Sequence, residues 1–333
     1  MDGTLIDAEN ALRAFNTWFG KSEFGRIAIT QQPEPGFGQS WPTLVYLPMT
    51  AYLDDTQRWQ LMGHINNRLT EFVEEVTPHE VSHQWWGHMV GWSTYRDQWL
   101  SEGFAFFSAG LFLQLTNKSP DSYLRYWDHA REMLLAKNEY GRRANDAGPV
   151  WMGLRLQTFR NANGYQAVVY RKGGYILHTL RSLMYDGKQG DRPFIEMMHE
   201  FVERNMNRAA STADFQRVAE KYMPAYLNVK GDGKLDWFFN EWVYGTAIPK
   251  YKFDYKVASE PDGKWMLHCQ LTQSEVPDDY VMLVPIYGEL EGQIRRLGTA
   301  RIVGNTTLSD IQLKLPLKPR KVMINAWHDI LEQ

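Results

Sequence analysis

Cysteine is almost absent from this sequence of 333 residues: Cys269 stands alone, which excludes an internal disulfide framework. No apolar run approaches the ~20 residues needed to cross a bilayer. The first residues lack the basic start and apolar centre of a signal peptide. The chain also has no excess of positive charge, because its net charge is −3. Nucleic acid is therefore not an expected partner. These absences indicate a soluble protein without a membrane segment, whose compartment the sequence leaves unknown.

Aromatic residues, by contrast, are abundant. They make up 14% of the chain and include thirteen tryptophans, which indicates a large hydrophobic core. The charged fraction of 23% is ordinary for a globular protein. The length allows two domains at the usual size of about 150 residues each.

The first part of the chain has mainly helical periodicity. We expect helices over 7–19, 55–90, 102–115, 120–137, from 164 onward, 194–204, 212–222 and 235–242, and strands over 26–30 and 43–47 separated by a loop over 31–42. Pro78 favours a break in the second helix, because proline is tolerated in a first helical turn. His79 would then stand in the opening turn of a new helix.

The last part of the chain shows short alternating runs separated by turns. Such runs occupy 252–257, 264–271, 280–287, 293–302 and 321–325, a spacing typical of a small β-sandwich. The sequence therefore predicts an α+β protein, with a mostly helical domain over 1–248 and an all-β domain over 249–333.

One stretch carries a chemical signature: His79 to His83 read H-E-x-x-H. Residues four apart on a helix lie on the same face, so His79 and His83 can direct two imidazoles at one metal ion. Glu80 lies one step around the helix, where it can reach a water on the metal. The pattern predicts a zinc ion with a general base beside it.

Glu102 is the expected third ligand. Eighteen residues separate it from His83, enough to leave one helix and enter a second. Two histidines and a glutamate with an open fourth position are typical of a catalytic zinc, because structural sites are closed. We therefore expect one Zn²⁺ per chain. His88 would lie about 140° from His83 on a continuing helix and is not expected to share the metal.

The stretches HEVSHQWWGH and WLSEGFA together resemble the M1 family of zinc aminopeptidases. The resemblance implies a thermolysin-like catalytic domain over 1–248, a β-sandwich domain over 249–333, and peptides as substrates. Tyr170, in the sequence Tyr-Arg-Lys-Gly, matches the family tyrosine that stabilises the tetrahedral intermediate. The family's further domains before and after these two are not in the sequence, so domains of a longer parent chain are candidate partners.

The chain departs from the family at its G-x-M-E-N motif, which aligns with residues 36–40. Gln39 stands where the family glutamate binds the α-amine of the substrate. A neutral amide offers no charge to an ammonium group, so amine anchoring should be weaker. We expect Gln39 to line the amine side of the cleft, with Gly36 and Gly38 allowing close backbone approach.

The predicted activity is metal-assisted peptide hydrolysis, most simply by an aminopeptidase. Glu80 would act as general base and then acid, and Tyr170 would donate a hydrogen bond to the oxyanion. One alternative is an endopeptidase on the same fold, which Gln39 favours. The other is a non-catalytic zinc domain that serves as a binding module, which the presence of both Glu80 and Tyr170 disfavours.

Overall fold

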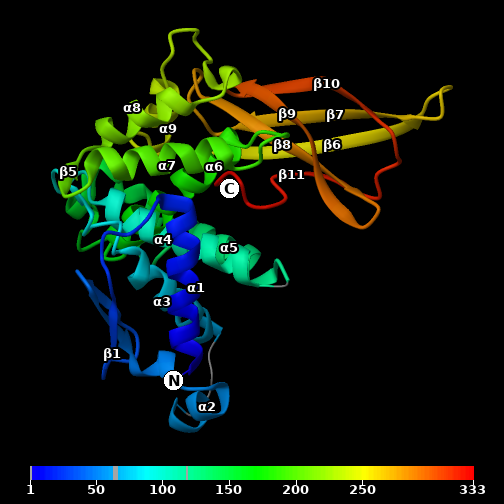
Figure 1. Ribbon diagram of the computed structural model, residues 1–333. Helices are drawn as coiled ribbons and strands as arrows, with labels where there is room; N and C mark the ends of the chain where they lie inside the picture. Colours follow the sequence, from blue (N-terminus) through cyan, green and yellow to red (C-terminus); the bar gives the residue numbers. More distant parts are fainter. Residues whose placement is uncertain (1, 63–66, 118) are drawn as a thin grey trace.

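The computed structural model describes residues 2–62, 67–117 and 119–333. Figure 1 shows a helical part followed by long strands that extend from one side of it. The amino terminus lies at the end of the helical part remote from the strands, and the carboxyl terminus returns to the junction between the two parts. The order of elements confirms the predicted α+β class.

The helices account for most of the chain up to residue 242. The α-helices of the described residues are α1 (Asp2–Phe19), α2 (Asp55–Met62), α3 (Asn67–Ser82), α4 (Trp99–Thr116), α5 (Asp121–Leu135), α6 (Gly173–Met184), α7 (Arg192–Asn205), α8 (Thr212–Tyr222) and α9 (Asp236–Trp242). The start of α8 follows the sequence closely, because Ser211 and Asp214 form the capping box that this spacing favours.

Helix α3 corrects the prediction at Pro78. The helix continues through this proline and ends at Ser82, so His79 lies in its last turn and His83 in the turn that follows. The expected extension of the helix to Val90 is also wrong, because residues 83–89 form turns that lead into β4 (Val90–Trp92). Pro78 is buried, and tertiary packing here outweighs the local preference against proline inside a helix.

The helix expected from residue 164 onward begins as a π-helix. This segment, η4 (Gln166–Lys172), precedes α6 directly. A π-helix is wider than an α-helix and often marks a functional site. Its place in the chain matters because it carries Tyr170.

A small sheet lies beside the amino-terminal helix. In it β1 (Ala28–Gln32) runs parallel to β3 (Leu44–Pro48), and β2 (Gln39–Trp41) pairs antiparallel with the other edge of β3. Strand β2 corrects the prediction of an uninterrupted loop over 31–42. Its three residues are too few to show a period of two.

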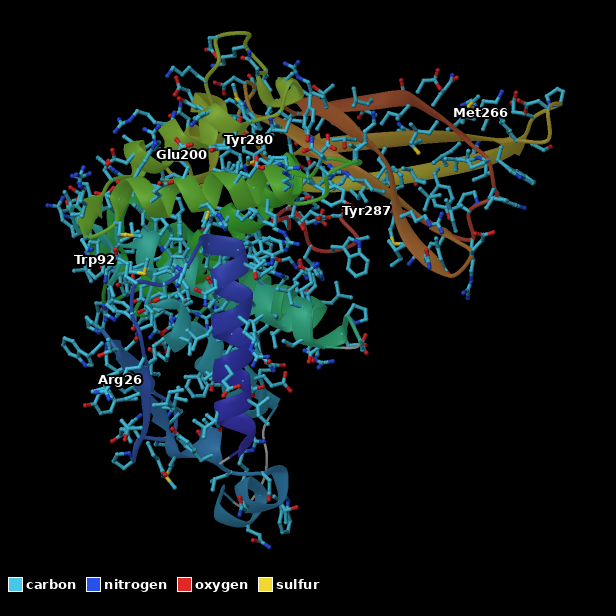
Figure 2. All side chains as sticks on the ribbon, in the orientation of Figure 1. Arg26, Trp92, Glu200, Met266, Tyr280 and Tyr287 are labelled. Carbon is cyan, nitrogen blue, oxygen red and sulfur yellow. The ribbon has the colours of Figure 1, made fainter. Side chains whose placement is uncertain are left out.

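The strands after residue 249 form two three-stranded antiparallel sheets, with orders β10-β7-β6 and β11-β8-β9. They are β6 (Lys250–Ser259), β7 (Trp265–Ser274), β8 (Val281–Leu290), β9 (Gln293–Val303), β10 (Thr306–Leu315) and β11 (Val322–Ile324). Strand β10 was not predicted. Figure 2 shows Met266 towards the free end of these strands, with Tyr280 and Tyr287 nearer the helices. The division into domains at residue 248 remains a prediction.

Two glycines bring the helices of the site together. A Cβ atom on Gly103 of α4 would lie 2.8 Å from the Cα atom of Gly173, the first residue of α6. Only glycine permits this backbone contact. Glu102 and Tyr170 therefore come from elements that touch, although they are far apart in the sequence.

The remaining short elements connect these parts. They are the parallel pair β4 and β5 (Arg208–Ala210) and the 3-10 helices η1 (Met49–Tyr52), η2 (Ala144–Ala147), η3 (Val150–Leu156) and η5 (Ala225–Leu227). Within the described ranges, no helix has the length and apolar character needed to span a membrane.

Candidate metal centre

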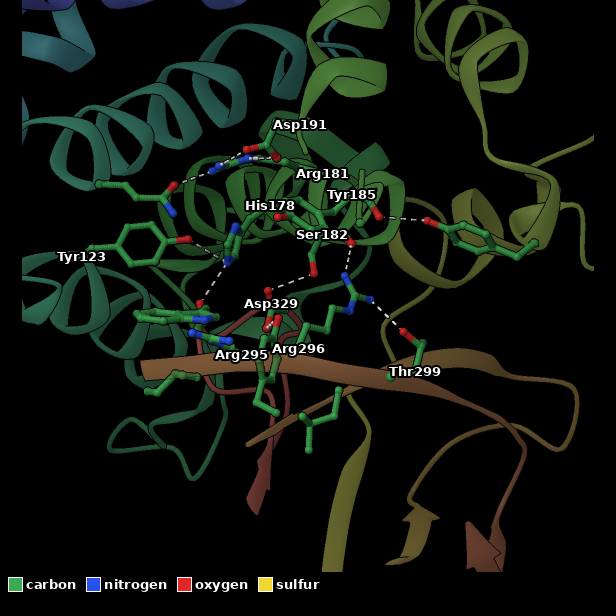
Figure 3. Close-up of a pocket in the computed structure, with 18 residues that line it drawn as sticks. Tyr123, His178, Arg181, Ser182, Tyr185, Asp191, Arg295, Arg296, Thr299 and Asp329 are labelled. Carbon is green, nitrogen blue, oxygen red and sulfur yellow. Dashed lines mark hydrogen bonds and ion pairs between the residues drawn. The ribbon is translucent and has the colours of Figure 1, made fainter. Parts of the chain in front are cut away.

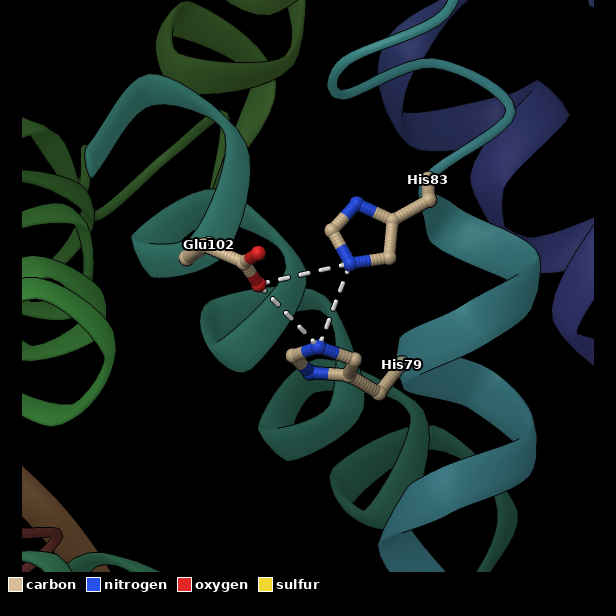
Figure 4. A group of neighbouring side chains, drawn as sticks. All are labelled: His79, His83 and Glu102. Atoms are coloured by element: carbon tan, nitrogen blue, oxygen red, sulfur yellow. Dashed lines mark hydrogen bonds and ion pairs between the residues drawn. The ribbon is translucent and has the colours of Figure 1, made fainter. Parts of the chain in front are cut away.

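His79, His83 and Glu102 converge at the end of α3 and the start of α4 (Figure 4). The two histidine Nε2 atoms are 3.2 Å apart. The Oε2 atom of Glu102 lies 3.6 Å from Nε2 of His79 and 3.4 Å from Nε2 of His83. The structure thus brings together the three residues that the sequence predicted.

These separations fit a metal ion better than direct hydrogen bonds. Charge-assisted hydrogen bonds are usually about 2.7–2.9 Å long. Ligands at roughly 2.0–2.1 Å from a tetrahedral zinc ion stand about 3.3 Å from one another. The ligand set, two imidazoles and one carboxylate, is also that of catalytic zinc sites.

The charges of the three groups are strongly coupled. Burial lowers the pKa of His83, but the charge of Glu102, the hydrogen bond to it and the charge of Glu80 together outweigh burial and raise that pKa to about 9. Burial raises the pKa of Glu102, but the charges of His83 and His79 and the hydrogen bonds with both rings together hold that pKa well below its usual range. A cation that binds here must displace the proton of His83, so metal binding weakens as the pH falls.

A second layer of contacts fixes the His83 ring. Its Nδ1 atom lies 2.8 Å from the backbone oxygen of Trp86, so Nδ1 keeps its proton and a metal displaces the proton of Nε2. The hydroxyl of Ser101 donates to the same oxygen over 3.1 Å. Gly87 makes this turn possible, because its φ is +109° and a Cβ atom would lie 2.9 Å from the Ser101 hydroxyl.

Glu80 lies beside the group and is 7% exposed. Burial raises the pKa of its carboxyl, the neighbouring charges of His79 and His83 lower it, and that of Glu102 raises it again. Gly38 lies against this side chain, since a Cβ atom there would be 2.5 Å from Oε1 of Glu80. One of the predicted substrate-binding glycines is therefore in contact with the predicted base.

Tyr170 stacks on His79, with ring centroids 6.2 Å apart and an angle of 3° between the planes. Burial raises the pKa of the phenol far above its ordinary range, and the nearby charge of Glu102 adds to the rise. The hydroxyl therefore keeps its proton at neutral pH and can donate it in a hydrogen bond.

Tyr165 is a further residue of the site that the sequence did not indicate. Its ring lies 5.8 Å from that of Tyr170 at an angle of 80°. Burial raises the pKa of Tyr165, and hydrogen bonds with Tyr170 and Gln98 oppose the rise. On an α-helix, residues five apart diverge by about 140°. The wider π-helix brings such residues to the same side. Tyr165 could therefore have been found from the sequence only if the π-helix itself had been predicted.

Lys172 and Gly173, which complete the Tyr-x-Lys-Gly sequence, have structural contacts. Lys172 is fully buried and donates to the backbone oxygen of Gly245 over 3.0 Å. Burial lowers the pKa of its ammonium group to about 7. These contacts anchor the end of the π-helix to the segment after α9, and Gly173 allows the approach to α4.

Gln84 holds β2 beside the metal-binding turn. It is completely buried, its Nε2 donates to Ser40 Oγ (2.8 Å) and to Trp41 O (3.0 Å), and its Oε1 accepts from Thr43 N (2.9 Å). Gln39, next to Ser40 in β2, is exposed and donates to the Ser40 backbone oxygen. Apart from its own chain neighbours, no described residue has an atom within 4 Å of the position that a Cβ on Gly36 would take. The roles of Gln39 and Gly36 thus stay predictions.

Comparison with known proteins identifies the family. The family model described as "Peptidase family M1 domain" matches residues 57–242, more than half of the chain. The chain belongs to peptidase family M1.

The M1 relatives are distant in sequence. Aminopeptidase N of Acetobacter pasteurianus is 29% identical over 105 residues, which cover 30% of this chain and 28% of that protein. Endoplasmic reticulum aminopeptidase 2 of Homo sapiens is 23% identical over 194 residues, covering 57% of this chain and 18% of that protein. The chain thus matches less than a third of the length of these relatives.

A solved structure shares the fold over the whole length of this chain. Aminopeptidase A of Legionella pneumophila, solved in complex with aspartic acid, superposes with a TM-score of 0.63 at 16% identity. The match covers 100% of this chain and 34% of that one. With M1 membership, zinc is the cofactor expected of the chain, and the His–His–Glu group fits it.

His88 does not belong to the metal-binding group found in the described residues, as expected. The reason differs from the prediction, because His88 lies in a turn and not on a continuing helix. Burial lowers the pKa of its imidazole to about 4, and the charge of His83 contributes to this shift, so the ring is neutral.

Proposed function

We propose that this M1 chain hydrolyses peptide bonds and removes residues from the amino terminus of peptides. The proposal rests on one observation: Glu80 and Tyr170, which are far apart in the sequence, lie beside the same His–His–Glu group. In this proposal His79, His83 and Glu102 hold zinc. The substrate is a peptide with a free amino terminus.

Bound zinc would acidify a water molecule and polarise the scissile carbonyl. Glu80 accepts the proton of the attacking water and delivers it to the leaving amine. Burial of Glu80 and its raised pKa suit both roles, because the carboxyl then gains and loses a proton more easily near neutral pH. Gly38 restricts the carboxylate on the side of β2.

Tyr170 donates its hydroxyl hydrogen bond to the oxyanion of the tetrahedral intermediate. The stack on His79 and the contact with Tyr165 support this role, because they fix the direction of the hydroxyl before the substrate arrives. Such preorganised donors give some of the largest contributions to catalysis.

Gln39 favours a second candidate function, an endopeptidase on the same fold. Its exposed side chain carries no charge with which to attract a free α-amine. An enzyme that anchors the amine weakly would also accept peptides with a blocked amino terminus. The non-catalytic alternative is less well supported, because a binding module has no need for both Glu80 and Tyr170.

One experiment separates these functions. Zinc content is measured together with hydrolysis of a panel of aminoacyl fluorogenic amides, each paired with its N-acetylated form. An aminopeptidase cleaves the free forms and spares the acetylated ones, whereas an endopeptidase cleaves internally quenched acetylated peptides. One zinc per chain with no hydrolysis of either kind would contradict both catalytic proposals and support a binding module.

A further inference from the structure

A cavity of about 700 Å³ lies between α6 and β9, away from the metal centre (Figure 3). Side chains from α6, from β8 and β9, and from the carboxyl-terminal segment line it, and none of the lining residues belongs to the His–His–Glu group. Small-molecule sites commonly have volumes of about 300–1,000 Å³ and lie where structural layers meet. The size and place of this cavity suit a small ligand.

A β-bulge in β9 forms one wall of the cavity. The pairing of β9 with β8 shifts between Ile286 and Tyr287, which leaves Leu297 as an extra residue. Such a bulge redirects the side chains beside it, and all residues over 294–299 line the cavity. Gly288 accommodates the bulge, because a Cβ atom there would lie 2.8 Å from Cδ1 of Leu297.

The carboxylates of the cavity already have partners. Asp191 accepts two hydrogen bonds from Arg181, of 2.8 and 2.7 Å. Asp329 accepts from the hydroxyls of Ser182 and Tyr287, each over 2.9 Å. A cationic ligand would have to compete with these contacts.

Among the described residues, Arg295 and Arg296 of β9 donate their hydrogen bonds to uncharged acceptors. Arg296 donates to the backbone oxygen of Ser182 over 2.9 Å and to the Thr299 hydroxyl over 3.0 Å. Arg295 donates to the side-chain oxygen of Gln293 over 3.3 and 2.9 Å. Each guanidinium has five N–H donors, so both keep donors for a further acceptor.

The lining as a whole carries a positive charge. Three arginines face two aspartates among the lining residues. His178 adds no charge, because burial and then the charge of Arg181 lower its pKa to about 3. Spare donors and a net positive charge favour an anion.

We propose that this cavity binds a small organic anion that carries a carboxylate or phosphate group, held by Arg295 and Arg296. The tyrosines that line it, among them Tyr123 and Tyr226, would contact the organic part. The proposal is independent of the peptidase activity, since it involves no residue of the metal centre.

Calorimetric titration of the full chain with inorganic phosphate and with succinate tests this proposal, at an ionic strength held constant with sodium chloride. We expect saturable binding of at least one probe, weakened about tenfold or more in R296Q, because a charge-assisted hydrogen bond is lost. R301Q is the matched control, since Arg301 lies exposed on the same strand outside the cavity. It should bind as the unaltered chain does.

R295Q gives a second variant for the case in which R296Q fails to fold, because Arg295 is exposed and its hydrogen bonds within the described ranges go to Gln293. Weakening in R295Q with none in R301Q supports the site, and the preferred probe identifies its anionic group. Heats that do not saturate with either probe, or equal weakening in R301Q, would overturn the proposal.

Discussion

Gly38 and Glu80 are in direct contact: a Cβ atom on the glycine would lie 2.5 Å from Oε1 of the glutamate and 2.8 Å from its Cγ. Real Cβ atoms essentially never come this close to another atom, so a larger residue at position 38 would push the carboxylate aside. The residue directly before β2, next to the predicted amine-binding residue Gln39, therefore also limits where the predicted base can lie.

The first prediction concerns this contact. G38A should lower kcat by about 10–100-fold with zinc content unchanged, because a shift of about 1 Å in a catalytic group can cost about 10²-fold. G25A is the matched control, since Gly25 lies outside the predicted cleft and the described atoms leave the space around it open. Steady-state kinetics with metal analysis provides the measurement, and equal activity in the two variants would refute the contact's importance.

The second prediction concerns Glu80 itself. E80Q keeps the shape of the side chain but cannot accept a proton, so we expect zinc to remain bound and kcat to fall by about 10²–10⁴-fold, the usual contribution of general acid–base catalysis. Metal content and kcat are measured on the same preparation. Persistent turnover with stoichiometric zinc would rule out Glu80 as the base.

The third prediction separates the two tyrosines. Y170F should lower kcat by about 10²–10³-fold, the cost of losing one oxyanion donor. Y165F should cost less, about 3–10-fold, because its hydroxyl acts only through Tyr170. Y140F, at an exposed position, controls for the loss of a hydroxyl. A larger effect in Y165F than in Y170F would reverse the assigned roles.

The metal ligands could be predicted from the sequence because their arrangement is mostly local. Helical geometry alone places His79 and His83 one turn apart. Glu102 follows from its spacing and from the short path between α3 and α4. The structure adds the contact of Gly103 with Gly173, which explains how Tyr170 reaches the same place.

Other features could not be predicted because they depend on packing between distant segments. Pro78 suggests a helix break on local grounds, yet α3 continues through it in a buried position. The π-helix around Tyr170 has no periodicity that distinguishes it from an α-helix over so few residues. Strand β10 was missed because its pairing shifts between Leu308 and Ile311, which interrupts the period of two.

The fourth prediction concerns pH and Glu241, at the junction of helices and strands. Burial raises the pKa of this carboxyl to about 8, against an ordinary value of 4.5, while a 2.7 Å hydrogen bond from Val281 N opposes the rise. The folded chain thus holds a proton that the unfolded chain releases above about pH 4.5. The contribution of Glu241 to stability is therefore full below that pH and is lost as the pH rises to about 8.

Urea unfolding at pH 5 and pH 8 measures this effect. E241Q retains an acceptor for Val281 N but has no proton to lose, so its free energy of unfolding should fall less between the two pH values than that of the unaltered chain. E203Q, at an exposed position of α7, serves as the control and should keep the full fall. If the free energy of unfolding falls equally with pH in E241Q and in the unaltered chain, the raised pKa assigned to Glu241 is contradicted.

The fifth prediction restores a charge on β2. Q39E places a carboxylate where the resemblance to the M1 motif predicts glutamate, and a hydrogen bond to a charged group is stronger than a neutral one by about 1 kcal/mol, or about fivefold in affinity. KM for substrates with a free α-amine should fall about fivefold, and KM for their N-acetylated forms should not. Q31E adds the same charge to an exposed position of β1, on the other side of β3, and should change neither. If Q39E and Q31E act alike, Gln39 does not face the amine, and the weak anchoring inferred from it must be abandoned.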